Sequence, residues 1–142
     1  TERTVFLKGM MSADKLSAKN WNSLEWMYFL DGLPDKAAYD KLQKLDAAWH
    51  LTGTVNAEIG SRWYAHAIAS GIKSVWPSAA DYVTGIGRLY LIVPVYRALA
   101  QVSPDGLAYA KTIYARAKEG YHPLTQQAVE ALLAESGARW GS

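Results

Sequence analysis

The segment PDKAAYDKLQKLDAAWHL, residues 34–51, carries the clearest periodicity in the chain. Its apolar residues Ala38, Leu42, Leu45 and Trp49 follow one another at spacings of four, three and four. This spacing places side chains on one face of an α-helix, because the helix completes a turn about every 3.6 residues. The charged residues of the segment lie mostly off that face. The segment is therefore predicted to be an amphipathic helix that packs on a core with one side.

The same helical pattern recurs along the chain, between short connections that contain glycine or proline. Helices are also predicted in the segments 18–34, 56–71, 76–87, 89–101, 103–121 and 122–136. The fold class is predicted to be all-α, an α-α superhelix of the HEAT or armadillo kind, with about seven helices in antiparallel pairs. An irregular helical bundle is the alternative, since no sequence repeat of fixed period is found. This domain is predicted to span residues 17–142, after an N-terminal linking segment at residues 1–16.

The composition excludes several classes of function. The chain of 142 residues has a net charge of only +2 and no block of Lys or Arg, so no nucleic-acid partner is expected. It contains no cysteine, which excludes disulfides and thiolate chemistry. No apolar stretch approaches the roughly 20 residues that span a bilayer, so no membrane partner is expected. The N-terminus lacks the features of a signal peptide, which favours a cytoplasmic location, and it begins on Thr, which indicates a piece of a longer protein.

The sequence contains no self-sufficient active site. His50, His66 and His122 do not have the spacing of a zinc-binding helix, and no HExxH is present, so these histidines are predicted to be helix-end or surface residues. The Gly-Ile-Gly at 85–87 lacks the third glycine and the lysine of a phosphate loop, and no serine sits in a GxSxG turn. No catalytic residue, metal ligand or cofactor is therefore assigned to this chain.

Arg88 stands at the entrance of GRLYLIVPVYRALA, residues 87–100, the most apolar segment of the chain. Two interpretations remain open. In one, Arg88 marks a helix end and pairs with a nearby carboxylate; in the other, it anchors an anion at the wall of a cleft. Pro94 favours a bend over residues 87–93 that would direct the guanidinium outward, because proline removes a backbone donor and restricts the residue before it.

A second charged feature lies earlier in the chain. Glu58 and Arg62 have the i, i+4 spacing of a helix ion pair, which could be a surface bridge or, beside Trp63, a partly buried structural one. Neither version is catalytic.

Three motifs occur in a recognisable order: NAEIGSRW at 56–63, GRLYLIVPVYRALA at 87–100 and AKEGYHPLTQQAV at 117–129. Together they resemble the C-terminal helical domain of the leukotriene A-4 hydrolase/aminopeptidase family, and the likeness runs from about Trp21 to the final helix. The positions that match the family pattern are Asn56, Glu58, Ile59, Arg62, Trp63, Gly87, Arg88, Pro94, Lys118, His122, Pro123 and Thr125.

The resemblance implies a specific role. Members of this family are zinc aminopeptidases whose HExxH lies in a catalytic domain that is absent here, and that domain would be the partner of this one. The helical domain closes one side of the substrate cleft. The family arginine that corresponds to Arg88 binds the free carboxylate of short peptide substrates, or of a lipid epoxide where that activity exists. The alternative function is a free-standing helical-repeat module that binds a partner peptide or protein.

The chain departs from the family pattern at two places. Tyr90 stands where the family usually has lysine, so a second cationic contact with the substrate carboxylate is lost or replaced by a neutral phenol donor. This weakens the case for lipid epoxide hydrolysis and favours peptidase activity. Gly60 and Ser61 replace an Arg-Phe pair, which puts the local packing in question but not the fold.

Overall fold

The computed structural model describes residues 2–8, 11–16, 21–34 and 39–140, and all regular secondary structure within these ranges is helical. The α-helices are α1 (Glu2–Leu7), α2 (Ser23–Asp31), α3 (Tyr39–Trp49), α4 (Ala57–Ala69), α5 (Trp76–Gly85), α6 (Leu89–Val102), α7 (Pro104–Ala117) and α8 (Pro123–Arg139). Short 3-10 turns occupy Ala13–Lys15, Lys73–Val75 and Lys118–Gly120. Within the described ranges, no helix is both long and apolar enough to cross a membrane.

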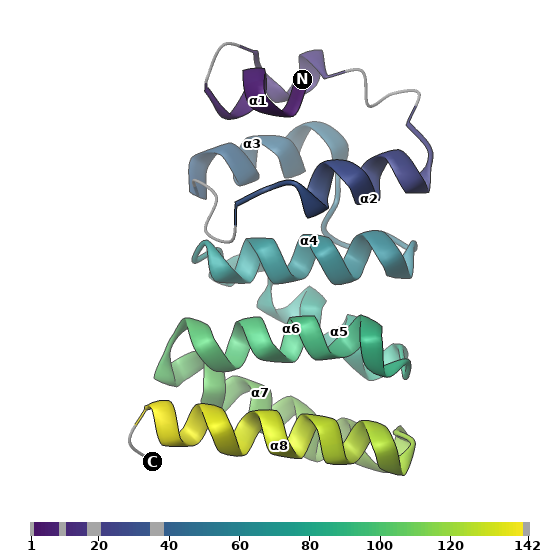
Figure 1. Ribbon diagram of the computed structural model, residues 1–142, viewed down its shortest axis with the longest axis vertical. Helices are drawn as coiled ribbons and strands as arrows, with labels where there is room; N and C mark the ends of the chain where they lie inside the picture. The colour runs from purple at the N-terminus through teal and green to yellow at the C-terminus, as the bar shows by residue number, and fades with distance from the viewer. Residues whose placement is uncertain (1, 9–10, 17–20, 35–38, 141–142) are drawn as a thin grey trace.

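The helices form an elongated stack with α1 at one end and α8 at the other (Figure 1). The helices α2, α4, α6 and α8 lie one above the other in the front layer and run in the same direction. The helices α3, α5 and α7 run back behind them, so that successive helices are antiparallel. As a consequence, the N-terminal ends of the front helices all reach the same edge of the stack, on the right in Figure 1.

This arrangement confirms the predicted all-α superhelix, since α2 to α8 are the helices that the sequence predicts. In the opening segment, Leu42 and Leu45 are buried and Trp49 is half-buried, as the periodicity requires, whereas Ala38 lies outside the described residues. The helix α1 falls within the predicted linking segment at residues 1–16, and its Phe6 is buried in the core. The domain boundary at residue 16 stays a prediction.

The helix ends follow local sequence signals. After α4, Gly71 adopts a φ of 96°, a left-handed conformation that glycine tolerates without steric cost. The amide of Ile72 then donates to the carbonyl of Ala67 at 3.0 Å, which satisfies an otherwise unpaired carbonyl in the last turn. At the start of α7, the Ser103 hydroxyl accepts from the amide of Gly106, and Pro104 occupies the first turn.

The predicted bend over residues 87–93 is wrong. Helix α6 begins at Leu89 and continues through Pro94 to Val102, and the chain changes direction earlier, where Ile86 and Arg88 adopt extended conformations. A proline inside a helix removes one backbone hydrogen bond. The loss is tolerated here because α6 packs on α4, α7 and α8 at once and buries six of its side chains. Tertiary packing therefore overrides the local preference of Pro94.

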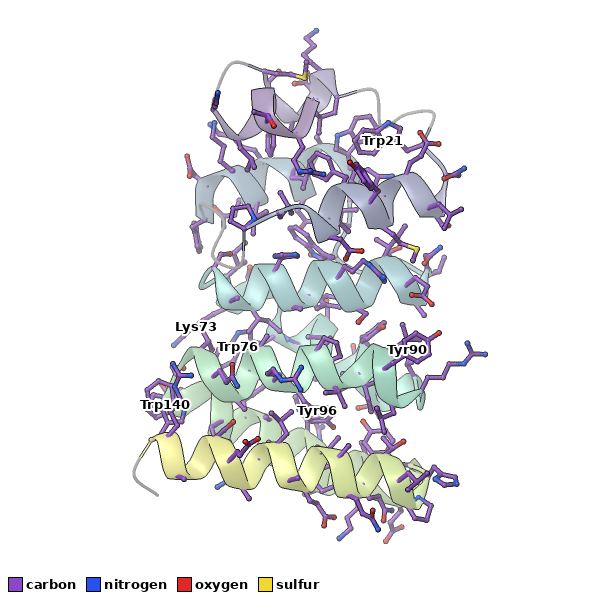
Figure 2. The ribbon with its side chains drawn as sticks, in the orientation of Figure 1. Trp21, Lys73, Trp76, Tyr90, Tyr96 and Trp140 are labelled. Carbon is purple, nitrogen blue, oxygen red and sulfur yellow. The ribbon has the colours of Figure 1, made fainter. Side chains whose placement is uncertain are left out.

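A chain of tyrosine hydroxyls ties α6 to its neighbours deep in the core. The Tyr121 hydroxyl donates to the carbonyl of Val83 at 2.6 Å, and the Tyr96 hydroxyl, in turn, donates to Tyr121 across 3.0 Å. Tyr96 is fully buried, and this burial raises the pKa of its hydroxyl above the usual range because a phenolate would lose its hydration. Figure 2 marks Tyr96 within the stack. The contacts connect α6 with the end of α5 and the turn before α8.

Replacing Gly106 with alanine is expected to lower the free energy of unfolding by about 1–2 kcal/mol. A Cβ at this position would collide with the Leu99 carbonyl of α6 and approach the Val102 side chain to 2.8 Å. Overpacking of this kind typically costs about 1–3 kcal/mol, offset in part by the better helix propensity of alanine. Gly85→Ala is the matched control, because its Cβ would meet nothing within 4 Å. Urea denaturation of both variants measures the difference, and equal stabilities would contradict the close approach of α6 and α7.

Candidate functional site

The first family-like motif starts helix α4 and attaches it to α2. The Asn56 side chain accepts a hydrogen bond from the amide of Ile59 at 3.0 Å, which caps the helix. Its amide nitrogen also donates to the Ser23 hydroxyl at 2.7 Å, in the first turn of α2. One side chain therefore sets the positions of two helix starts at the same edge of the stack.

Trp63, in the same motif, has a structural role. Its side chain is fully buried, and its indole nitrogen donates to the Thr52 hydroxyl at 2.9 Å. The Thr52 hydroxyl in turn donates to the Asp46 carboxylate at 2.7 Å. The indole thereby connects the core of α4 with the loop that follows α3.

The two residues that replace the family's Arg-Phe pair, Gly60 and Ser61, pack tightly in this chain. Gly60 lies against the ring of Tyr82, where a Cβ would come within 2.7 Å of a ring carbon. The Ser61 hydroxyl donates to the carbonyl of Leu91 at 2.7 Å and so joins α4 to α6. The Tyr82 hydroxyl donates to the carbonyl of Ala57, and burial raises the pKa of Tyr82 to about 12. Small residues at 60 and 61 therefore allow close contacts of α4 with both α5 and α6.

The third motif begins helix α8. The Nδ1 atom of His122 accepts from the amide of Leu124 at 3.1 Å, and Pro123 occupies the first helical position. The Lys118 ammonium lies 3.3 Å from the Glu130 carboxylate, and Thr125 is buried. His122 is thus a helix-end residue, as predicted, and His50 lies directly after α3. Among the described residues, no group of His, Asp or Glu is arranged to hold a metal ion.

Arg88 occupies the position just before α6, where its side chain makes no capping hydrogen bond and is exposed. Within the described part of the chain, no carboxylate lies within 4.0 Å of its guanidinium, so the pairing with an acidic neighbour is not observed. Its Nη1 instead faces the Tyr90 hydroxyl at 3.5 Å. The guanidinium is exposed and is not desolvated within this chain. It is directed outward at the edge where the front helices begin.

Tyr90 links this cation to a group of charged side chains. Its hydroxyl donates to Glu58 Oε1 at 3.0 Å, and Figure 2 shows Tyr90 at the edge where α6 begins. A carboxylate accepts but does not donate, so the phenol proton lies toward Glu58 and only an oxygen lone pair faces Arg88. Tyr90 would have to break this bond to donate to a substrate.

The group continues from Glu58 to helix α2. Glu58 Oε2 accepts from Arg62 Nη1 at 3.0 Å, which confirms the predicted i, i+4 pair. The Nε of Arg62 donates to Asp31 at 2.8 Å, at the end of α2. No role was predicted for Asp31 from the sequence. The signal that was available is an acidic residue in the last turn of a helix, where the dipole disfavours negative charge and a tertiary partner is therefore expected.

Two shallow cavities flank these side chains. One, of about 440 Å³, is lined by Glu58, Arg88 and Leu91 together with the connection at 85–87. The other, of about 270 Å³, is lined by Tyr90, Asp31, Arg62 and Pro94 among others. The structure therefore brings Arg88, Tyr90, Glu58 and Arg62 together, whereas His122 and Pro123 begin a different helix.

Comparison with known proteins agrees with these motifs. Residues 21–133 match the family described as "Leukotriene A4 hydrolase, C-terminal". The chain is 28% identical over 134 residues to "Leucine aminopeptidase 2" of Yarrowia lipolytica, with 86% of this chain and 20% of that protein covered. It is 28% identical over 93 residues to "Leukotriene A-4 hydrolase homolog" of Botryotinia fuckeliana, with 66% of this chain and 14% of that protein covered.

"Leucine aminopeptidase 2" of Neurospora crassa is also 28% identical, over 122 residues that cover 84% of this chain and 18% of that protein. The chain thus spans no more than about a fifth of the length of these curated relatives. Three motifs in order, an all-helical superhelix and a family match over most of the chain agree with one another. The chain belongs to the leukotriene A4 hydrolase C-terminal domain family.

Proposed function

We propose that this chain is the non-catalytic C-terminal domain of a zinc-dependent aminopeptidase. In that enzyme it closes one side of the substrate cleft, and Arg88 binds the free carboxylate of short peptide substrates. The observation that carries the proposal is the placement of Arg88. It is an exposed cation without a carboxylate partner in the described part of the chain, beside a cavity of about 440 Å³.

The chemistry of this role is positioning. A guanidinium offers paired N–H donors that fit the two oxygens of a carboxylate. Arg88 also stands at the N-terminal end of a helix of 14 residues, where the helix dipole adds a favourable field for an anion. Holding the last residue of a short peptide would place the first peptide bond at a fixed distance, over the catalytic centre of the other domain. Arg88 thus contributes to the rate without touching the reacting atoms.

The supporting contacts explain how the arginine is directed. Tyr90 lies two residues after Arg88, and Glu58 holds its hydroxyl from α4. Tyr90 takes part in substrate binding by holding Arg88 in place through these contacts. Because the side chain of Tyr90 is neutral, Arg88 is the single cation of residues 88 and 90. The second cation that the family usually places at position 90 is lost, and this departure is the reason to favour peptide hydrolysis over lipid epoxide hydrolysis.

This chain by itself is expected to bind no stoichiometric zinc and to cleave no aminoacyl reporter substrate, because it contains no HExxH. The complete protein is expected to do both. Metal analysis and a fluorogenic assay on the two proteins test this. Tightly bound zinc in the isolated chain, or a complete protein without aminopeptidase activity, would contradict the proposal.

The competing function is a free-standing interaction module with the same superhelix. The coding sequence upstream of Thr1 distinguishes the two. An adjoining HExxH domain supports the aminopeptidase, and a start codon close to Thr1 supports the module.

A further inference from the structure

The charged side chains next to Arg88 do not balance one another. Asp31 and Glu58 both contact Arg62, at 2.8 and 3.0 Å, so two carboxylates share one guanidinium. The three side chains together carry one excess negative charge. Glu58 is the member of this group nearest to the proposed substrate site, because it lines the same cavity as Arg88.

The geometry places this excess charge beside the bound end of a peptide. Arg88 and Glu58 each lie within 3.5 Å of the same phenol oxygen, that of Tyr90. Once a substrate carboxylate has neutralised Arg88, the remaining field in the cavity is that of Glu58 and its neighbours. The side chain of the substrate's last residue enters this field. Partial exposure of Glu58, at 33% of its side-chain surface, screens the field but does not remove it.

We propose that Glu58 is a specificity-determining residue, which disfavours substrates whose C-terminal residue is acidic and favours those with a neutral or basic one. This inference rests on the proposed function, since it requires a peptide end at Arg88. A second carboxylate on the substrate meets the unbalanced charge of Glu58, whereas a lysine side chain there compensates it. The identity of residue 90 contributes to this specificity, because the neutral phenol of Tyr90 does not compensate the negative charge of Glu58.

The test compares two substrates that differ only in charge, Ala-Ala-Gln and Ala-Ala-Glu, with the complete protein at low ionic strength. We expect kcat/KM to be roughly threefold to tenfold higher for Ala-Ala-Gln, because a partly screened like charge disfavours the second carboxylate of Ala-Ala-Glu. In the Glu58→Gln variant the ratio is expected to fall below about twofold. The ratio in the unmodified protein is also expected to shrink as salt is raised to about 0.5 M, where screening is stronger.

Two further variants separate the effect of the Glu58 charge from that of the hydrogen bond between Tyr90 and Glu58. Tyr90→Phe removes the hydroxyl but no charge, so it is expected to lower kcat/KM for both substrates and to leave their ratio unchanged. Glu135→Gln, an exposed carboxylate on α8, is the control and is expected to change neither value. The ratio is the readout in every case, and a purely structural role of Glu58 would not move it.

The outcomes distinguish this inference from the function on which it rests. The role of Glu58 is overturned if the ratio of kcat/KM for the two substrates is near one in the unmodified protein, or if Glu58→Gln leaves that ratio unchanged. The proposed function survives this outcome as long as Arg88→Ala lowers kcat/KM for both substrates. If Arg88→Ala leaves both rates unchanged, the proposed function fails and the inference fails with it. A ratio that collapses only in Glu58→Gln supports both.

Discussion

Replacing Arg88 with alanine is expected to lower kcat/KM for tripeptides by about 30-fold to several thousand-fold in the complete enzyme. Truncating one partner of a buried, hydrogen-bonded charge pair typically costs about 2–5 kcal/mol, and each 1.4 kcal/mol corresponds to about a tenfold change. The guanidinium is exposed in this chain, so the upper part of this range requires that the catalytic domain and the substrate cover it. Steady-state kinetics with a series of tripeptides measures the loss.

Two controls make the result specific to the carboxylate. Arg97→Ala removes another exposed arginine from α6 and is expected to leave kcat/KM unchanged. A tripeptide whose C-terminus is amidated has no carboxylate to bind, so the unmodified enzyme and Arg88→Ala are expected to cleave it at similar rates. Folding stability should change by less than about 0.5 kcal/mol, as is usual for exposed positions. An unchanged kcat/KM for the free tripeptide would remove Arg88 from the substrate cleft.

Replacing Trp63 with alanine is expected to lower the free energy of unfolding by about 3–5 kcal/mol. The indole is fully buried, so its removal leaves a cavity in the hydrophobic core beside α4. The Thr52 hydroxyl also loses the donor with which it forms a hydrogen bond. Globular domains are stable by only about 5–15 kcal/mol, and the substitution would thus remove a large part of the total. Urea denaturation followed by circular dichroism measures the change.

The control for Trp63 is Leu124→Ala, which truncates a side chain that is 63% exposed and should change stability by less than about 0.5 kcal/mol. Trp63→Phe keeps most of the apolar volume but not the donor to Thr52, and we expect it to fall between the two. A loss of less than about 1 kcal/mol for Trp63→Ala would show that this motif residue is not needed for the core.

The variants at Trp63 and Arg88 distinguish motif residues that stabilise the fold from motif residues that surround the proposed substrate site. Asn56 and Trp63 hold helix α4 in place, whereas Glu58 and Arg62, on the same helix, reach toward Tyr90 and Asp31. The front helices begin at one edge of the stack, and this edge carries Arg88 (Figure 1). The stacked helices therefore hold Arg88, Tyr90 and Glu58 together at that edge.

The sequence by itself determined helices α2 to α8 and the local signals at their ends, whereas α1 lies in the segment that was predicted to be a linker. A periodic stripe such as Leu42 and Leu45 buries one face of a helix wherever it occurs, and caps such as Asn56 and His122 act on amides two or three residues away. The same local signals placed Arg88 at a helix start. They act over one or two turns, which is why they can be read without knowing the rest of the fold.

Only the tertiary structure decided what surrounds Arg88. Asp31 meets Arg62, and Tyr90 meets Glu58, across 31 and 32 residues of chain, and these contacts exist because α2, α4 and α6 are stacked with their ends in register. Pro94 likewise shows a local preference overridden by the packing of α6 on its neighbouring helices. Side-chain partners from different helices depend on how the whole stack is assembled, and no pattern within a single helix records that geometry.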